Sequence, residues 1–405
     1  MMISDLIAAP SAQSQPPPLQ RHILTSEYPP QPGGVSDYTA HVAAGLAEMG
    51  EEVHVWSPGP ASLSVTPEGV HVHRAMGSFM PSDLKRAGAE LDRFPEPRRI
   101  LVQYVPHGYG RRSMNVPFCN WLLDRARRGD VIDLMAHEAF LTFEGSWRQY
   151  GAAAVHRLMA AILLRAATRV WVSNREGERR LRPYIFGRDV PFEWLPVPSN
   201  VPVIQDFAAS EAIRRQYVPA GGLLLGHFGT YGAPVLTVLE PVLARIAEVN
   251  PDQPLVLMGR GSLEFRARIL ERNPAWDRNL HATGPLAPQD LSLHLAACDL
   301  LVQPYPDGAT TRRGSLMAGI SHGKPILTTR GVVTESIWEQ SRGVALAPAG
   351  DTDAFLALLR QLLRDPAERA RLAQAGRQLY HDRFDISRTV AAFHAAALPS
   401  VPCAS

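Results

Sequence analysis

Residues 299–329 constrain the fold more than any other part of the chain. The unit opens with a short apolar segment, 299–304, which is typical of a buried strand and runs into a polar loop. A helix, 315–320, follows with Ser315 as its expected cap, and a second apolar segment, 326–329, comes after it. This order of strand, helix and strand predicts a parallel unit, and therefore an α/β fold.

The loop inside this unit is predicted to bind an anion. In an open parallel sheet, ligands bind at the carboxyl ends of strands, where a helix N-terminus offers unpaired N–H groups and a partial positive charge. Arg312 and Arg313 precede the helix and add guanidinium groups suited to phosphate oxygens. A surface turn with two solvated arginines is the alternative interpretation. The ligand-binding residues predicted in this segment are Asp307, Arg312, Arg313, Gly314, Ser315 and Leu316.

The same alternation of strands and helices runs through the rest of the chain in two halves. The other apolar segments typical of strands are residues 22–25, 52–56, 70–73, 100–104, 131–135, 169–173, 223–228, 255–258 and 280–283. A chain of 405 residues is long enough for two domains, each with its own core. We therefore predict two α/β domains, each with a doubly wound parallel sheet. The predicted boundaries are 1–20 for a disordered tail, 21–202 for the N-terminal domain, 203–222 for a linker region, 223–380 for the C-terminal domain and 381–405 for a last helix and tail.

Composition narrows the class of protein. The chain has 41 Lys and Arg residues against 39 Asp and Glu residues, a balance that argues against binding nucleic acid through phosphate neutralisation. The isolated cysteines Cys119, Cys298 and Cys403 show no spacing for a disulfide framework or a metal, which favours a reducing cytoplasm. Uncharged apolar runs are too short to cross a bilayer, so no integral membrane segment is expected.

The first half carries its candidate site residues after two of its strands. Gly33 and Gly34 stand at a helix entrance after the first strand, where they allow a ligand to approach the backbone, although an ordinary proline and glycine turn is equally compatible. His137 follows the strand 131–135 at the same sheet edge. We predict it as the catalytic residue, hydrogen-bonded to a substrate hydroxyl, with a structural histidine as the alternative. No second histidine falls at ligand spacing, so no metal is predicted.

Strands of the second half also end in loops that contain glycine. Their backbone amides are placed to line one sheet edge, although such loops also occur merely to turn the chain. Neither the dinucleotide fingerprint nor a P-loop is present, and no cofactor is predicted. The candidate ligand-binding residues in these loops are Gly229, Thr230 and Arg260.

Taken together, these motifs resemble those of glycosyltransferase family 4, whose members have the GT-B fold. The matching segments are residues 28–38, 170–173, 195–202, 226–232, 259–262, 284–299, 323–325, 343–351 and 383–385, so that the resemblance covers about residues 21–397. It implies two Rossmann-like domains that face each other across a cleft, with the last helix crossing back onto the first domain. It also implies that the C-terminal domain binds a nucleotide sugar and that the N-terminal domain binds most of the acceptor.

The resemblance assigns roles to several residues. Gly33 and Gly34 would approach the donor diphosphate, and His137 would contact the donor sugar. The backbone from Gly284 to Leu286 would contact the base.

This chain departs from the family pattern at the diphosphate. Family members carry an arginine and a lysine after the first strand of the C-terminal domain, where this chain has residues 229–233 without either charge. The two glutamates of the family fall on Thr310 and Ala318. We infer that Arg312, Arg313 and the helix at Ser315 bind the anion instead, helped by Arg260, and that Asp307 or Glu335 replaces a hydroxyl-binding carboxylate.

We therefore predict a hexosyltransferase-type glycosyltransferase, retaining and metal-independent, that moves a sugar from a nucleotide diphosphate sugar to an acceptor hydroxyl. The acceptor is unknown, and neither a nucleic acid partner nor an integral membrane segment is expected. A nucleotide-sugar epimerase of the same fold and a catalytically silent nucleotide- or sugar-binding protein are the alternatives.

Overall fold

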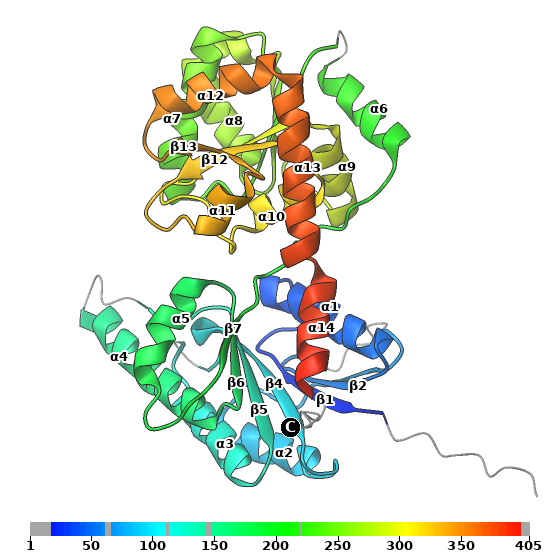
Figure 1. The fold of residues 1–405 in the computed structure, drawn as a ribbon, viewed down its shortest axis with the longest axis vertical. Coiled ribbons are helices and arrows are strands. Elements are labelled where there is room, and N and C mark those ends of the chain that lie inside the picture. Colours follow the sequence, from blue (N-terminus) through cyan, green and yellow to red (C-terminus); the bar gives the residue numbers. More distant parts are fainter. Residues whose placement is uncertain (1–17, 61–65, 111–112, 142–146, 219–220, 398–405) are drawn as a thin grey trace, which may run out of the picture.

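The computed structural model describes residues 18–60, 66–110, 113–141, 147–218 and 221–397, which form two α/β domains (Figure 1). The first domain has a seven-stranded sheet with the order β3 (Val70–His73), β2 (Glu52–Trp56), β1 (Gln20–Leu24), β4 (Arg99–Tyr104), β5 (Val131–Ala136), β6 (Arg169–Val172) and β7 (Phe192–Trp194). All of its paired strands are parallel. Helices of this domain are α1 (Gly34–Glu48), α2 (Pro81–Leu91), α3 (Val116–Arg127), α4 (Trp147–Ala166) and α5 (Arg175–Leu181).

The second domain repeats this plan with six parallel strands. Their order is β10 (Leu280–Ala282), β9 (Leu255–Met258), β8 (Leu225–Phe228), β11 (Leu300–Gln303), β12 (Ile326–Arg330) and β13 (Ala345–Pro348). Its helices are α6 (Phe207–Tyr217), α7 (Ala233–Val249), α8 (Ser262–Arg272), α9 (Pro288–Ala297), α10 (Gly314–Ser321), α11 (Ser336–Ser341), α12 (Thr352–Arg364) and α13 (Pro366–Arg383). Strands such as β9 and β11 are buried along their whole length, as parallel strands covered by helices on both faces must be.

The unit predicted from residues 299–329 is present as β11, α10 and β12. Leu301 lies opposite Ile326 in the parallel register of the two strands. The predicted cap is wrong, because the N-cap residue is Arg313, two positions earlier, and Ser315 is already the second residue of α10. The Ser315 hydroxyl lies 2.8 Å from the Tyr305 hydroxyl.

Two predicted boundary segments look different in the structure. Residues 1–17 lie outside the described residues, and Gln20, expected in the tail, already belongs to β1. The expected linker 203–222 contains α6, which packs against α9. Asp206 caps this helix by accepting a hydrogen bond from Ala209 N at 2.8 Å, which explains why a helix forms in a segment with few apolar residues.

The last helix, α14 (Ile386–Ala397), leaves the second domain and packs on α1 of the first, as predicted (Figure 1). Its Phe393 is fully buried and meets the Trp171 ring edge-on at 4.7 Å. Arg21 in β1 donates to the Phe393 carbonyl at 3.0 Å and to the buried Glu51 carboxylate at 2.9 Å. None of the helices in the described part of the chain is long and apolar enough to span a membrane.

Candidate functional site

Both sheets reverse their strand order once, and these two points fix where a ligand is expected. The first sheet reverses between β1 and β4, and the second between β8 and β11. In doubly wound sheets the crevice at such a reversal, outside the carboxyl ends of the strands, is the usual binding site. Helix α1 begins after β1, and α10 begins after β11, so each crevice contains a helix N-terminus.

His137 lies directly after β5 and is buried. Its Nε2 lies 2.8 Å from Gln103 Oε1, so Nε2 carries the proton and Nδ1 is left as an acceptor. The ring also meets Tyr38 of α1 edge-on at 4.8 Å. Burial, reinforced by the nearby Arg312 charge, lowers the pKa of His137 to about 3. His137 is therefore a neutral hydrogen-bonding group at physiological pH. It does not act as a charged general acid.

Arg312 connects the two domains beside His137. Its Nη2 lies 2.7 Å from Glu138 Oε1, and both side chains are partly exposed. Glu138 also lies 3.4 Å from His107 Nδ1. Glu138 is thus paired with a residue of each domain. Because an exposed ion pair contributes little to stability, Arg312 can exchange this carboxylate for a ligand anion at small cost.

Arg313 is held more firmly than Arg312. It forms an ion pair with Asp307, and its guanidinium lies over the Tyr305 ring at 4.7 Å from the centroid. Its buried Nε has no hydrogen-bond partner among the described residues. The charges of Asp307 and Arg313 thus neutralise each other at the N-terminus of α10.

A second bridge between the domains runs through Thr311, which is fully buried. Its backbone N–H donates to Glu335 Oε2 at 2.5 Å, while its hydroxyl lies 3.0 Å from Glu335 Oε1 and 3.2 Å from the carbonyl of Ser173. The Ser173 hydroxyl donates to the carbonyl of His137 at 2.9 Å. Burial raises the pKa of Glu335, against the hydrogen bonds from Thr311 that lower it. The loop before α10 is therefore fixed to the ends of both β5 and β6.

The start of α1 differs from what its two glycines suggested. Glu27 Oε1 accepts hydrogen bonds from the backbone N–H groups of Val35 and Ser36 at 3.0 and 3.1 Å. A Cβ on Gly33 would clash with this carboxylate, whereas a Cβ on Gly34 would meet open space. Glu27 thus occupies the positive end of α1, where the sequence predicted a diphosphate.

The remaining candidate residues of the second domain form a separate group at the ends of β8, β9 and β10. Gly229 N donates to the Met258 carbonyl at 3.1 Å, and the Gly284 carbonyl accepts from Gly259 N at 3.1 Å. Thr230 and Arg260 follow their strands and are exposed, whereas Leu286 is half-buried. These loops follow neighbouring strands of the second sheet, whereas Thr311 and Arg312 contact the first domain.

The first turn of α10 presents its backbone rather than its side chains. Leu316 is fully buried in the core, so only its N–H is available to a ligand. Gly314 is exposed, and a Cβ there would meet no atom within 4 Å. The N–H groups of the first turn have no acceptor within the helix, which is the geometry of an anion site.

Sequence reasoning missed three parts of the site. Glu27 is separated from its two amide partners by eight and nine positions, spacings that match no capping motif. The contact of Thr311 with Ser173 spans 138 positions. Gln103 lies within a buried strand, and no motif around it indicated a role in the site.

Solved structures with the same architecture define the class of fold. Sucrose-phosphate synthase from Thermosynechococcus elongatus is similar with a TM-score of 0.68 at 16% identity, over 93% of this chain and 98% of that chain. Anabaena HepE in complex with UDP is similar with a TM-score of 0.64 at 15% identity, over 93% and 100%. The trehalose-phosphate synthase (UDP-forming) from Burkholderia xenovorans, in complex with glucose-6-phosphate, is similar with a TM-score of 0.67 at 13% identity, over 94% and 99%. The protein therefore has the predicted GT-B fold.

The sequence comparison is more specific for the second domain. Residues 223–365 match the family described as glycosyl transferases group 1. This match confirms the predicted resemblance for the second domain, and the GT-B fold agrees with it over nearly the whole chain. The search of curated proteins finds no match.

Proposed function

We propose that this protein transfers a hexosyl group from a nucleoside diphosphate sugar to an acceptor hydroxyl, with retention and without a metal. The observation that carries the proposal is the meeting of Arg312, from the loop before α10, with Glu138, the residue after His137. It places an exchangeable guanidinium and a helix N-terminus of one domain against a neutral imidazole of the other.

In this proposal the second domain binds the diphosphate of the donor. The diphosphate accepts hydrogen bonds from the backbone N–H groups of Gly314, Ser315 and Leu316 and from Arg312, which releases Glu138. Arg260, exposed at the end of β9, supplies further positive charge. We give Arg313 a positioning role, because Asp307 already neutralises it. Guanidinium and amide donors stabilise the departing phosphate, a task that a metal performs in other enzymes.

The first domain contacts the sugar that is transferred. Nδ1 of His137 accepts a hydrogen bond from a hydroxyl of the transferred sugar, while Gln103 holds the ring through Nε2. During transfer the bond from C1 to the phosphate oxygen breaks and a bond from C1 to the acceptor oxygen forms on the same face. The departing phosphate takes the acceptor proton. Retention is supported by the family resemblance, and cytoplasmic location by the free, buried thiols of Cys119 and Cys298.

The first test is thermal stability with UDP, GDP, ADP, CDP and dTDP and with their sugar conjugates. A ligand that binds only the folded state raises the melting temperature. We expect one nucleotide to do so and its sugar conjugate to serve as donor in a transfer assay. If no nucleotide shifts the melting temperature and no conjugate is consumed, the proposal is wrong.

The Arg312→Ala variant tests the residue that carries the proposal. We expect its affinity for the effective nucleotide to fall by about 10- to 100-fold, because a hydrogen bond to a charged group is lost. Arg330→Ala is the matched control, since Arg330 is also exposed and paired, 3.4 Å from Glu339. Calorimetric titration gives both affinities, and equal affinities for the two variants would exclude Arg312 from the site.

A further inference from the structure

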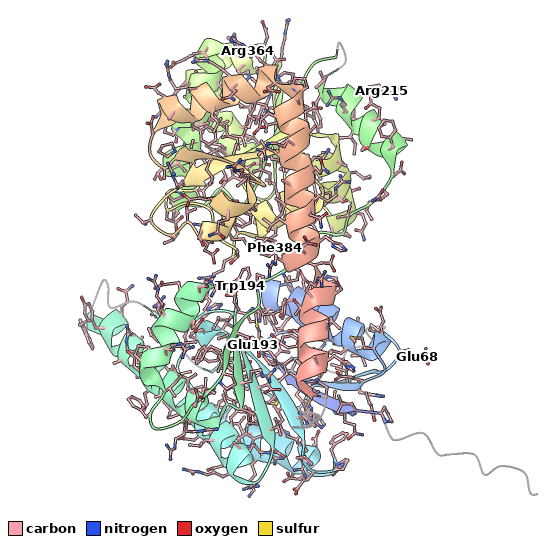
Figure 2. The ribbon with its side chains drawn as sticks, viewed as in Figure 1. Glu68, Glu193, Trp194, Arg215, Arg364 and Phe384 are labelled. Carbon is pink, nitrogen blue, oxygen red and sulfur yellow. The ribbon has the colours of Figure 1, made fainter. Side chains whose placement is uncertain are left out.

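A cavity of 770 Å³ lies between the two domains, and its lining includes neither Arg312 nor the first turn of α10, to which the diphosphate is assigned above. Its walls come from α5 and Trp194 of the first domain and from the loop after β12, α11 and the end of α13 of the second. Trp194 lies where the domains meet, close to Phe384 (Figure 2). A volume of this size accommodates a mono- or disaccharide.

The charges in this cavity are not balanced within the protein. Within the described ranges, neither Arg175 nor Arg383 has an ion-pair partner, whereas Arg179 is paired with Glu176. The Arg175 guanidinium lies over the Trp194 ring at 5.7 Å from its centroid. The wall of the cavity thus carries three arginines against two carboxylates, Glu176 and Glu335, and this excess of positive charge is suited to an anionic ligand.

Trp194 adds a directional signal. Its indole N–H is buried and has no hydrogen-bond acceptor among the described residues. Buried tryptophan N–H groups usually find a partner. Trp194 lines the cavity together with the polar residues Thr334, Ser336 and Gln340. A ligand rich in hydroxyl oxygens supplies such an acceptor.

The cavity is coupled to the transfer site through its wall. Glu335, which lines it, holds Thr311, and Thr311 contacts Ser173, whose hydroxyl is bonded to the His137 carbonyl. An occupant therefore lies next to the residues that position the donor, on the other side of the Thr311 bridge.

We propose that this cavity binds the acceptor, and that the acceptor is an anionic saccharide whose phosphate or carboxylate contacts Arg175 and Arg383. The Trp194 N–H donates to one of its ring or hydroxyl oxygens. This inference rests on the proposed function, because only a transferase has an acceptor.

The test is calorimetric titration of the full chain with four probes: a hexose 6-phosphate, a hexuronate, the neutral hexose and inorganic phosphate. Each titration is done with the protein free and then saturated with the nucleotide found by thermal stability. We expect one anionic saccharide to bind at least about tenfold more tightly than the neutral hexose. Tighter binding of the phosphate or of the carboxylate form identifies the charged group.

Three variants locate the binding. Arg175→Ala and Arg383→Ala are expected to weaken it about tenfold or more, and Trp194→Phe, which keeps the ring and removes the N–H, about fivefold to tenfold. Both arginines are exposed, so their removal leaves the fold intact, which circular dichroism verifies. Arg364→Ala is the control, on α12 far from the cavity (Figure 2).

The outcomes separate this inference from the proposed function. Three results would each overturn the cavity assignment and leave the proposed transferase function intact. They are nucleotide binding without saccharide binding, equally tight binding of the neutral hexose, and unchanged saccharide affinity in the Arg175 and Arg383 variants. Competition between saccharide and nucleotide would also overturn it, because the cavity would then belong to the donor. Saccharide binding that needs Arg175, in a protein that binds no nucleotide, would support the cavity and overturn the transferase.

Discussion

Glu27 fills the helix end that Gly33 and Gly34 were predicted to keep open for a phosphate. A carboxylate at this place satisfies two N–H groups of α1 and complements the positive end of the helix. The two neighbouring glycines thus have different structural roles. Gly33 makes room for Glu27, whereas Gly34 is not needed for space.

This difference predicts opposite effects of two alanine substitutions. Gly33→Ala forces the Glu27 carboxylate away from its amides, so the free energy of unfolding should fall by about 1 to 2 kcal/mol. Gly34→Ala adds a methyl group to the first helical residue in open space and should be neutral or stabilising by up to about 1 kcal/mol. Urea unfolding measures both. Equal effects at the two positions would show that Glu27 does not hold the helix end.

At the scale of elements, three adjacent strands bring together a row of neutral imidazoles. His22 of β1 stacks on His54 of β2 at 5.1 Å, and His54 Nδ1 lies 3.1 Å from His73 Nε2 of β3. Burial, together with the neighbouring histidines, lowers the pKa of His22 to about 3 and that of His54 to about 4. The charges of Arg98 and Arg125 act in the same direction on His22.

These histidines should make the first domain sensitive to acid. The unfolded chain binds protons below about pH 6.5, whereas folded His22 stays neutral until about pH 3, so stability falls as the pH drops through this window. Between pH 7 and pH 5 we expect His22 to account for about 1 to 2 kcal/mol of the loss.

His22→Asn tests this, because it removes the titrating ring and retains an acceptor for the Trp56 indole N–H, 3.2 Å away in the native protein. Urea unfolding at both pH values should show a shallower pH dependence for this variant than for His381→Asn, an exposed control. If both variants match the parent protein, His22 is not the source.

The elements show clearly what the sequence alone could predict. Buried parallel strands carry continuous apolar runs, and for this reason residues 131–135 and 326–329 were found within a residue or so of β5 and β12. A last helix was predicted within residues 381–405, and α14 lies there. Helix α6 was missed, since only one of its residues is buried. Site contacts such as Arg312 with Glu138 depend on how two domains meet, which local patterns do not encode.

At the scale of the whole molecule, the stability of the first domain depends on the far end of the chain. Val390 and Phe393 of α14 belong to the same core cluster as Ile23 of β1 and Trp171 of β6. The first 200 residues therefore lack part of their core until the last helix has been made.

Phe393→Ala measures this dependence. Removing a fully buried phenylalanine should cost about 3 to 5 kcal/mol in the free energy of unfolding. Phe207→Ala, at a residue that is 82% exposed, should change it by less than about 0.5 kcal/mol. Chemical denaturation followed by tryptophan fluorescence compares the two. A small loss for Phe393→Ala would mean that α14 is only loosely attached.

The return of the chain to the first domain also affects how the two domains can move relative to each other. The polypeptide passes between the domains twice, once before α6 and once between α13 and α14, and the two passages touch, with Ser199 N 3.1 Å from the Tyr380 hydroxyl. Two covalent tethers at one place act as a hinge with a fixed pivot. A rotation of one domain about this point is compatible with both connections, whereas a sliding movement of one domain past the other would stretch them. Such a rotation would keep Arg312 aligned with Glu138 across the domain boundary.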